Sequence, residues 1–160
     1  MFAEEKFRVR APIQRVWEFM SDLKKIGPCI PGCEKIEAVG ENTYEMTITI
    51  RLPVFSITAR SITTLIEIAP PYHLKSVTEG QYDIGGGEFH QETLVDLEEI
   101  SDNEVEISFS ADTKLEGGLA GFSEKIMNTV AKELAEQFTK NIQTRLEREP
   151  GDEDFPMGQA

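Results

Sequence analysis

Two cysteines and two histidines are the residues of this sequence with the greatest capacity for chemistry. Cys29 and Cys33 are four positions apart in a segment that also holds two prolines, whereas His73 and His90 lie much farther along the chain. A structural zinc site needs about four ligands in close geometry, and neither histidine stands at a recognisable ligand spacing from the cysteines. We therefore expect no metal site and assign both cysteines to packing in an irregular loop over residues 27–33; a metal or redox pair is the alternative.

The other polar candidates also favour structural roles. In the predicted sheet, His73 and His90 fall on positions that face solvent, and no arrangement of serine, histidine and acid is recognisable, so we expect no catalytic residues. Arg51 and Arg60 are assigned to solvated outer positions. The alternative is an inward arginine paired with an anionic or carbonyl group.

The glycine run at residues 85–87 resembles a phosphate-binding loop only superficially. It lacks the following lysine and the helix N-terminus that give such loops their charge complementarity. We predict a turn, a bulge or a close approach of two backbone segments there.

A long amphipathic helix, predicted over residues 119–149, is the element around which these candidates are arranged. Apolar residues recur every three or four positions, and charged residues fill the other face. The apolar stripe comprises Leu119, Phe122, Ile126, Val130, Leu134, Phe138, Ile142 and Leu146, widened by Met127, Ala131 and Ala135. Such a helix would be about 45 Å long, so it must cross a broad apolar surface, for which a curved sheet is the natural partner.

The preceding residues supply that sheet. Alternating residues near the N-terminus predict a first strand, which is followed by two short helices over residues 12–20 and 23–26. Residues 34–115 then indicate an antiparallel meander, in which a change of apolar parity predicts a bulge near Arg60. We predict an α+β fold in which a curved antiparallel sheet of about seven strands wraps around the C-terminal helix.

Length and composition limit the class of protein. The chain has 160 residues and a net charge of −13, so we expect one domain over residues 1–149 and no nucleic-acid partner. Residues 150–160 are acidic and poor in apolar side chains, which predicts a disordered tail. Because no run of about 18 apolar residues and no signal-peptide core occurs, a cytoplasmic location is expected.

A strongly bent sheet does not contact a helix along its whole length, so a cavity is predicted between them. The inward positions that are small or polar, and so leave room for a mainly apolar molecule, are Ser61, Thr63, Ser76, Gly87, Gln91, Thr93 and Thr113. The expected ligand cavity is lined by Trp17, Ile48, Phe55, Ile57, Ser61, Leu74, Phe89, Gln91, Phe109, Phe122, Ile126, Met127, Val130 and Leu134. A packed core with ordinary threonines is the alternative.

Five short motifs then suggest a family. They are Val9-Arg10-Ala11-Pro12 followed by Val16-Trp17, Cys29-Ile30-Pro31-Gly32-Cys33, Pro70-Pro71, Gly85-Gly86-Gly87 and Gly117-Gly118-Leu119-Ala120. Together they resemble the CoxG family of carbon monoxide dehydrogenase accessory proteins, part of the START-like superfamily, over roughly residues 2–147. The resemblance implies a helix-grip fold with an apolar cavity.

The same resemblance implies a role beside an enzyme. It points to a non-catalytic accessory protein of a CO dehydrogenase-like molybdenum hydroxylase that binds a lipophilic small molecule, quinone-like or lipid-like, and has no other cofactor. Members that anchor to membranes carry a longer C-terminal extension with an apolar end, whereas this sequence stops at Glu-Asp-Phe-Pro-Met-Gly-Gln-Ala. We therefore do not expect direct membrane anchoring, although a position peripheral to the inner membrane face fits the family.

Two other functions stay open. An enzyme of the cyclase or hydrolase kind predicts a cluster of titratable groups deep inside the cavity. A protein adapter predicts a filled core and an exposed apolar patch.

Overall fold

The computed structural model describes residues 1–53 and 55–148 of the chain. Its first half contains β1 (Phe2–Val9), α1 (Ile13–Met20), α2 (Leu23–Ile26), the 3-10 turn η1 (Gly27–Cys29), β2 (Cys33–Gly40) and β3 (Thr43–Arg51). The second half contains β4 (Ser56–Ala69), β5 (His73–Tyr82), η2 (Ile84–Gly86), β6 (Gly87–Ser101), β7 (Glu104–Glu116), η3 (Gly118–Gly121) and α3 (Glu124–Leu146). The predicted tail, residues 150–160, and the predicted domain end at Glu149 lie outside the described residues.

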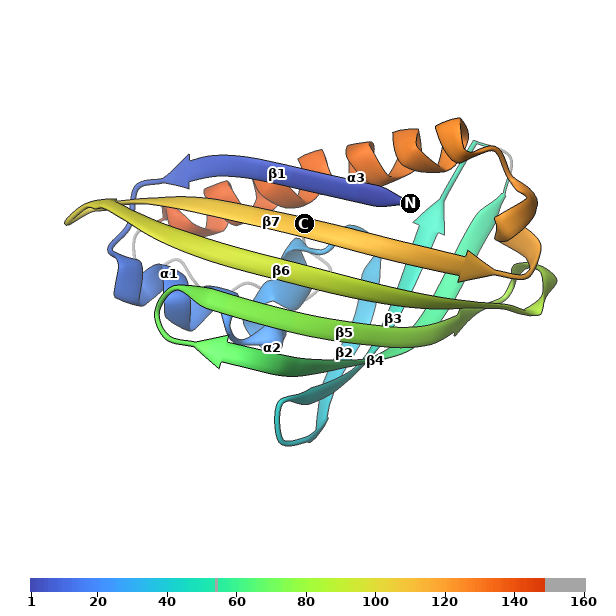
Figure 1. Ribbon diagram of the computed structural model, residues 1–160, viewed down its shortest axis with the longest axis horizontal. Coiled ribbons are helices and arrows are strands. Elements are labelled where there is room, and N and C mark those ends of the chain that lie inside the picture. The colour runs from blue at the N-terminus through green and yellow to red at the C-terminus, as the bar shows by residue number, and fades with distance from the viewer. Residues whose placement is uncertain (54, 149–160) are drawn as a thin grey trace.

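Seven antiparallel strands form one curved sheet in the order β1-β7-β6-β5-β4-β3-β2. Figure 1 shows β5, β6 and β7 as long, gently curved strands, with β2 and β3 crossing them steeply and α3 running alongside β1. The two short helices α1 and α2 follow β1, as predicted. This arrangement confirms the predicted α+β fold, in which a curved sheet is wrapped around a C-terminal helix.

The long helix begins later than the sequence predicted. Residues 118–121 form the 3-10 turn η3, and Ser123 caps α3 by accepting a hydrogen bond from the backbone nitrogen of Ile126 at 3.2 Å. The predicted start at Leu119 was wrong because helical periodicity in the apolar residues extends backward through a turn that is not α-helical. With 23 residues ending at Leu146, α3 is about 34 Å long rather than 45 Å.

The buried stripe on α3 is narrower than the predicted one, although every one of its residues was predicted. It consists of Met127, Ala131, Ala135, Ile142 and Leu146. Phe122 precedes the helix and is 38% exposed, and Ile126, one position from the stripe, is 54% exposed. Their assignment to the cavity was therefore wrong. For Ile126 the reason is that successive side chains on an α-helix are rotated by about 100°, so Ile126 points away from the face that buries Met127.

The predicted bulge near Arg60 was misplaced. The pairing of β3 with β4 runs without interruption through Arg60, which lies opposite Thr47. The irregularity in the sheet lies between Leu65 and Glu67, in the pairing of β4 with β5. Ile62 points outward and is 42% exposed, and this outward isoleucine caused the apparent change of parity.

The segment predicted as an irregular loop contains one regular turn. Residues 27–29 form η1, in which Ile30 donates a backbone hydrogen bond to Gly27 at 3.0 Å, and Cys33 already begins β2. A 3-10 turn accommodates Pro28 because proline suits the first positions of a helical turn, where its missing N–H is not needed.

Two clusters of buried apolar residues occupy opposite ends of the sheet. The larger cluster includes Trp17 of α1, Ile107 of β7 and Ile142 of α3. The smaller one joins Ile57, Tyr82 and Leu119. Along the strands, the positions between these clusters are mostly small or polar, and the candidate site lies there.

Candidate functional site

A cavity of about 290 Å³ lies between the inner face of the sheet and the middle of α3. Its walls come from β3 to β7, the start of β1, the helices α1 and α2, the segment after η1, and α3. A cavity that can hold one water has only about 10–15 Å³ of comparable volume, so this space is far larger than an ordinary packing defect. Its size lies at the lower limit for pockets that bind small organic molecules.

Short side chains on both walls explain why the space is open. The sheet contributes Ser61, Ser76 and Thr93, and the facing turns of α3 contribute Ala131 and Ala135. Longer residues at these five positions would meet across the gap and fill it, as side chains do in an ordinary protein core. The curvature of the sheet and the small residues therefore act together to leave the cavity.

Four polar residues form a row across the sheet wall of the cavity. Thr63 lies opposite Thr78, Thr78 opposite Gln91, and Gln91 opposite Thr113, so the row crosses β4, β5, β6 and β7. The hydroxyl oxygens of Thr63 and Thr78 are 2.7 Å apart. We call these four residues the polar row.

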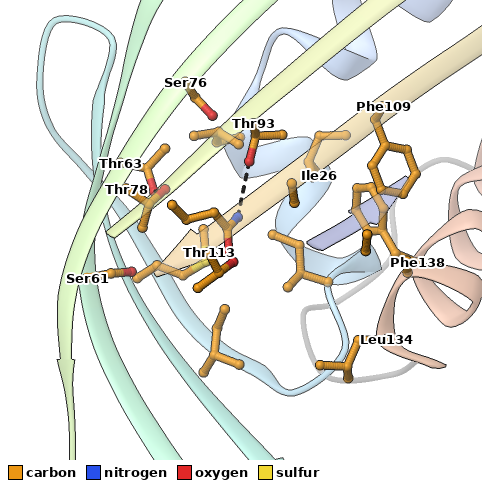
Figure 2. Close-up of a pocket in the computed structure, with 18 of the residues that line it drawn as sticks. Ile26, Ser61, Thr63, Ser76, Thr78, Thr93, Phe109, Thr113, Leu134 and Phe138 are labelled. Atoms are coloured by element: carbon orange, nitrogen blue, oxygen red, sulfur yellow. Dashed lines mark hydrogen bonds between the residues drawn. The ribbon is translucent and has the colours of Figure 1, made fainter. Parts of the chain in front are cut away.

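Hydrogen bonds link Gln91 to its neighbours. The hydroxyl of Thr113 donates to the Gln91 Oε1 atom at 2.9 Å, and the Gln91 Nε2 atom donates to the hydroxyl of Thr93 at 3.1 Å. Figure 2 shows Thr63, Thr78, Thr93 and Thr113 on one side of the pocket, with the bond to Thr93 dashed. These mutual bonds satisfy polar groups that would otherwise be costly to bury.

The opposite wall is apolar. Ile26 of α2 and the α3 residues Leu134 and Phe138 face the sheet across the pocket, as Figure 2 shows. Phe138 makes an edge-to-face contact with Phe109 of β7, with ring centroids 5.3 Å apart.

The lining of the whole cavity has no titratable side chain among the described residues. Among the described residues, it contains no aspartate, glutamate, lysine, arginine, histidine, cysteine or tyrosine side chain. Met1 does line the cavity, and its N-terminal ammonium group donates to the backbone carbonyl oxygen of Thr113 at 2.8 Å. That charge is thus held at the edge of the sheet by the backbone of β7.

A surface pocket of about 460 Å³ adjoins the cavity. Ile30, Pro31 and Leu134 line both spaces, so these three side chains separate the cavity from the surface between α3 and the β2–β3 region. The amide of Asn141 donates to the carbonyl oxygen of Cys29 at 2.9 Å and holds α3 against η1 beside this position.

The structure brings half of the predicted cavity residues together. The wall contains Ile48, Ser61, Leu74, Phe89, Gln91, Phe109 and Leu134. The predicted residues that lie elsewhere are Trp17 in the larger cluster, Phe55 and Ile57 in or beside the smaller one, Phe122 and Ile126 at the surface, and Met127 and Val130 on α3. That the first group contacts a ligand stays a prediction.

Other wall residues were not predicted. Leu23 and Ile26 come from α2, Ile30 from the following segment, and Ala131 and Ala135 from α3. Ala131 and Ala135 were a signal in the sequence that could have indicated the cavity. Two small residues four positions apart on the buried stripe mark a place where the helix either packs closely against its neighbour or leaves a space. Nothing local in the sequence indicates that α2 lies beneath the sheet.

Both cysteines are free thiols outside the cavity wall. Cys29 is buried, and burial raises the pKa of its thiol to about 11. Cys33 is half-buried, which also raises its pKa, and its Sγ atom lies 3.7 Å from the carbonyl oxygen of Lys35. Within residues 1–53 and 55–148, no group of three or more histidine, cysteine or acidic residues is placed to hold a metal ion.

The histidines and arginines also lie away from the cavity. His73 is held by Asp96 at 2.7 Å and Glu67 at 3.0 Å, and these hydrogen bonds raise the pKa of its imidazole. His90 lies 3.3 Å from the Glu79 carboxylate. Arg51 and Arg60 are exposed, as the sequence predicted.

The glycine run at residues 85–87 makes a close backbone approach to a second glycine pair. A Cβ atom on Gly85 would lie 2.6 Å from the Cα atom of Gly118, and one on Gly117 would lie 2.7 Å from the Cα atom of Gly87. Gly85, Gly86 and Gly117 also have positive φ angles. The run is therefore a turn that lets η2 contact η3, in agreement with the predicted close approach.

The chain matches a known protein family over most of its length. Residues 6–147 match the family described as the CoxG subunit of carbon monoxide dehydrogenase. No curated protein matched the chain. In the described part of the chain, no helix combines the length and the apolar character needed to cross a lipid bilayer.

Solved structures share the fold over nearly the whole chain. A conserved protein from Geobacillus kaustophilus is 25% identical, with a TM-score of 0.82 over 91% of this chain and 95% of that one. A START superfamily protein from Mycobacterium smegmatis is 14% identical, with a TM-score of 0.72 over 91% and 97%. The Zhui aromatase/cyclase from Streptomyces sp. R1128 is 16% identical, with a TM-score of 0.70 over 95% and 98%. The chain thus belongs to the carbon monoxide dehydrogenase CoxG family and has the START-like helix-grip fold.

Proposed function

We propose that this protein binds a lipophilic small molecule, quinone-like or lipid-like, in the cavity beneath α3, as a non-catalytic accessory protein of a CO dehydrogenase-like molybdenum hydroxylase. Family membership supports the accessory role and the partner. The proposed working location is the cytoplasm, peripheral to the inner membrane face, where such a molecule and the enzyme would both be within reach.

The composition of the cavity wall is the observation that carries this proposal. Apolar side chains from α2, α3 and the sheet surround a space of about 290 Å³, and the polar side chains are limited to uncharged hydroxyl and amide groups. Burial of apolar surface would supply most of the binding free energy, at roughly 25 cal/mol per Å². The few hydroxyl and amide groups would orient the molecule.

An enzyme of the cyclase or hydrolase kind is the main alternative, because one structural neighbour is an aromatase/cyclase. General acid or base catalysis needs a titratable group within hydrogen-bonding reach of the substrate. No titratable side chain among the described residues lines the cavity, which favours binding over catalysis. A purely protein-binding adapter has no use for a cavity of this size, so it is the weaker alternative.

Native mass spectrometry of the protein purified from a quinone-containing host tests the proposal. We expect an added mass that is lost on denaturation, or uptake of an added short-chain quinone by protein purified empty. Protein that is empty as isolated and takes up no quinone would contradict the proposal.

A cavity-filling variant provides a matched control. In Ala131→Phe, the new ring would occupy the space beside the polar row, because Ala131 is buried in the cavity wall. In Thr129→Phe, the same side chain would point to solvent from the same helix. We expect the first variant to lose uptake and the second to retain it; equal uptake by both would place the ligand elsewhere.

A further inference from the structure

We propose that the polar row, Thr63, Thr78, Gln91 and Thr113, is a head-group subsite that selects an uncharged, oxygen-bearing end of the ligand and rejects a carboxylate or phosphate. This inference rests on the proposed binding function and adds the chemistry and orientation of the bound molecule. The residues that set head-group selectivity are on β4 to β7, and the rest of the ligand points toward α3.

Unused hydrogen-bond donors in the row support an oxygen-bearing head group. The Gln91 amide nitrogen carries two hydrogens and donates one to Thr93 at 3.1 Å, so the other is available to a ligand oxygen. Between Thr63 and Thr78, one hydroxyl donates to the other across 2.7 Å, which leaves one hydroxyl hydrogen for the cavity. Because Thr78 and Gln91 are directly opposite on adjacent strands, these donors lie side by side.

The shortage of positive charge in the wall argues against an anionic head group. The described wall contains no lysine, arginine or histidine side chain that could pair with a carboxylate or a phosphate. The Met1 ammonium group keeps its charge, but its bond to the Thr113 carbonyl oxygen anchors it on the backbone at the edge of the sheet. Burying a poorly paired anion in such a site costs far more than hydrogen bonds to neutral donors return. An uncharged carbonyl or hydroxyl needs only the donors and acceptors that the row supplies.

The distribution of polar groups fixes the orientation. Hydroxyl and amide groups lie on the sheet wall, whereas Ile26, Leu134 and Phe138 form the facing wall (Figure 2). A head group placed against α3 would leave its oxygen without a partner. The oxygen-bearing end therefore lies on the sheet, and the apolar remainder extends toward Ile30 and Leu134, which separate the cavity from the surface pocket.

Three ring compounds of similar size test the inference. They are 2,3-dimethyl-1,4-naphthoquinone, 2,3-dimethylnaphthalene and 2-naphthoate, which carry two carbonyl groups, no head group and a carboxylate, respectively. Both reactive ring positions of the quinone are blocked, so addition of a thiol such as Cys33 cannot be mistaken for binding. Dissociation constants are measured for the folded full chain by titration calorimetry.

Two substitutions remove donors with little change in shape, and a third is the control. Gln91→Met removes the available amide hydrogen. Thr78→Val removes the hydroxyl directly opposite Gln91 and leaves the Thr63 hydroxyl one strand farther away. Thr64→Val makes the same change on the outward, half-buried neighbour of Thr63, which does not line the cavity. If Gln91→Met does not fold, Thr113→Val replaces it, because Thr113 is the hydrogen-bond donor to Gln91.

We expect each row variant to weaken quinone binding roughly fivefold while dimethylnaphthalene binds as tightly as to the wild type or tighter. Thr64→Val should change neither affinity, and naphthoate should bind the wild type at least about tenfold more weakly than the quinone does. Unchanged quinone affinity in both row variants, or naphthoate binding as tight as the quinone, would overturn the head-group subsite and leave cavity binding intact. Failure of all three compounds to bind would overturn both proposals.

Discussion

The phenol hydroxyl of Tyr82 donates a hydrogen bond to the carbonyl oxygen of Glu116 across 2.7 Å. The Tyr82 hydroxyl oxygen in turn accepts a bond from the backbone nitrogen of Leu119 at 3.1 Å, and the Tyr82 side chain is only 4% exposed. One buried hydroxyl thus ties the end of β5 to the turn that precedes α3. The position of α3 over the cavity depends in part on this link.

Replacing Tyr82 with phenylalanine should therefore destabilise the fold. The variant leaves the buried N–H of Leu119 and the carbonyl oxygen of Glu116 without their partner, so we expect a loss of about 1–3 kcal/mol in the free energy of unfolding by urea. Tyr72→Phe is the control because Tyr72 is 55% exposed. Equal stability of the two variants would show that the Tyr82 hydroxyl does not hold η3.

The contact between the two glycine segments makes a second prediction. Gly117 has φ +89°, and a Cβ atom there would lie 2.7 Å from the Cα atom of Gly87. Gly86 also has a positive φ, but a Cβ atom there would meet nothing within 4 Å. We expect Gly86→Ala to lower the free energy of unfolding by about 1–2 kcal/mol, because alanine is strained at a positive φ angle. Gly117→Ala should lower it clearly more, because the backbone at Gly87 must also move to make room for the new methyl group. Thermal unfolding of both variants measures the difference, and a cheaper Gly117→Ala would contradict it.

The two thiols should be poorly reactive in the folded protein. Burial raises the pKa of Cys29 to about 11, so its thiolate fraction at neutral to mildly alkaline pH is on the order of a thousandth or less. We expect iodoacetamide to label Cys29 at least about a hundredfold more slowly than in the urea-unfolded chain, with half-buried Cys33 reacting sooner. Peptide mass mapping over time assigns the sites. Rapid native labelling of Cys29 would contradict the buried position of η1.

The ion pairs of His73 should make stability depend on pH. Hydrogen bonds to Asp96 and Glu67 raise the folded-state pKa of His73 above its ordinary value of 6.5. The resulting stabilisation is fully present below pH 6.5 and is lost as the pH rises through the raised folded-state pKa. His73→Gln should therefore lower the melting temperature more at pH about 5.5 than at pH about 8.5, by a small amount because the site is at the surface. A larger loss at the higher pH would contradict this sign, and His90→Gln controls for loss of a surface histidine.

The strands, and the face of the sheet to which each side chain points, could be predicted because apolar and polar residues alternate along a single strand, which is a local property of the sequence. On β7, alternation places Val105, Ile107, Phe109 and Thr113 on the inner face, and all four are buried. The outward placement of Arg60 follows from the same rule. Errors arose where an apolar residue is exposed, as at Ile62, because alternation cannot distinguish a bulge from an outward isoleucine.

Most of the cavity wall could not be predicted because it comes from segments that meet only in the folded chain. Ile26 of α2 and Phe138 of α3 face the sheet although more than 100 residues separate them in sequence. Phe122 and Ile126 satisfied the helical period but lie outside the cavity, since α3 begins only after Ser123 and buries the neighbouring stripe. The period shows which residues share a face, whereas packing against the sheet decides where the centre of the buried face lies.

The sequence by itself determined the order of the elements, the inward positions of β7 and the occurrence of small polar residues on the inner face, because these depend on residue type and on spacing within one segment. Only the tertiary structure decided that Thr63, Thr78, Gln91 and Thr113 form one row, and that Ala131 and Ala135 face it across an open space. The physical reason is that a cavity is the difference between the space enclosed by the bent sheet and the volume of all side chains that enter it, a quantity that no single segment contains.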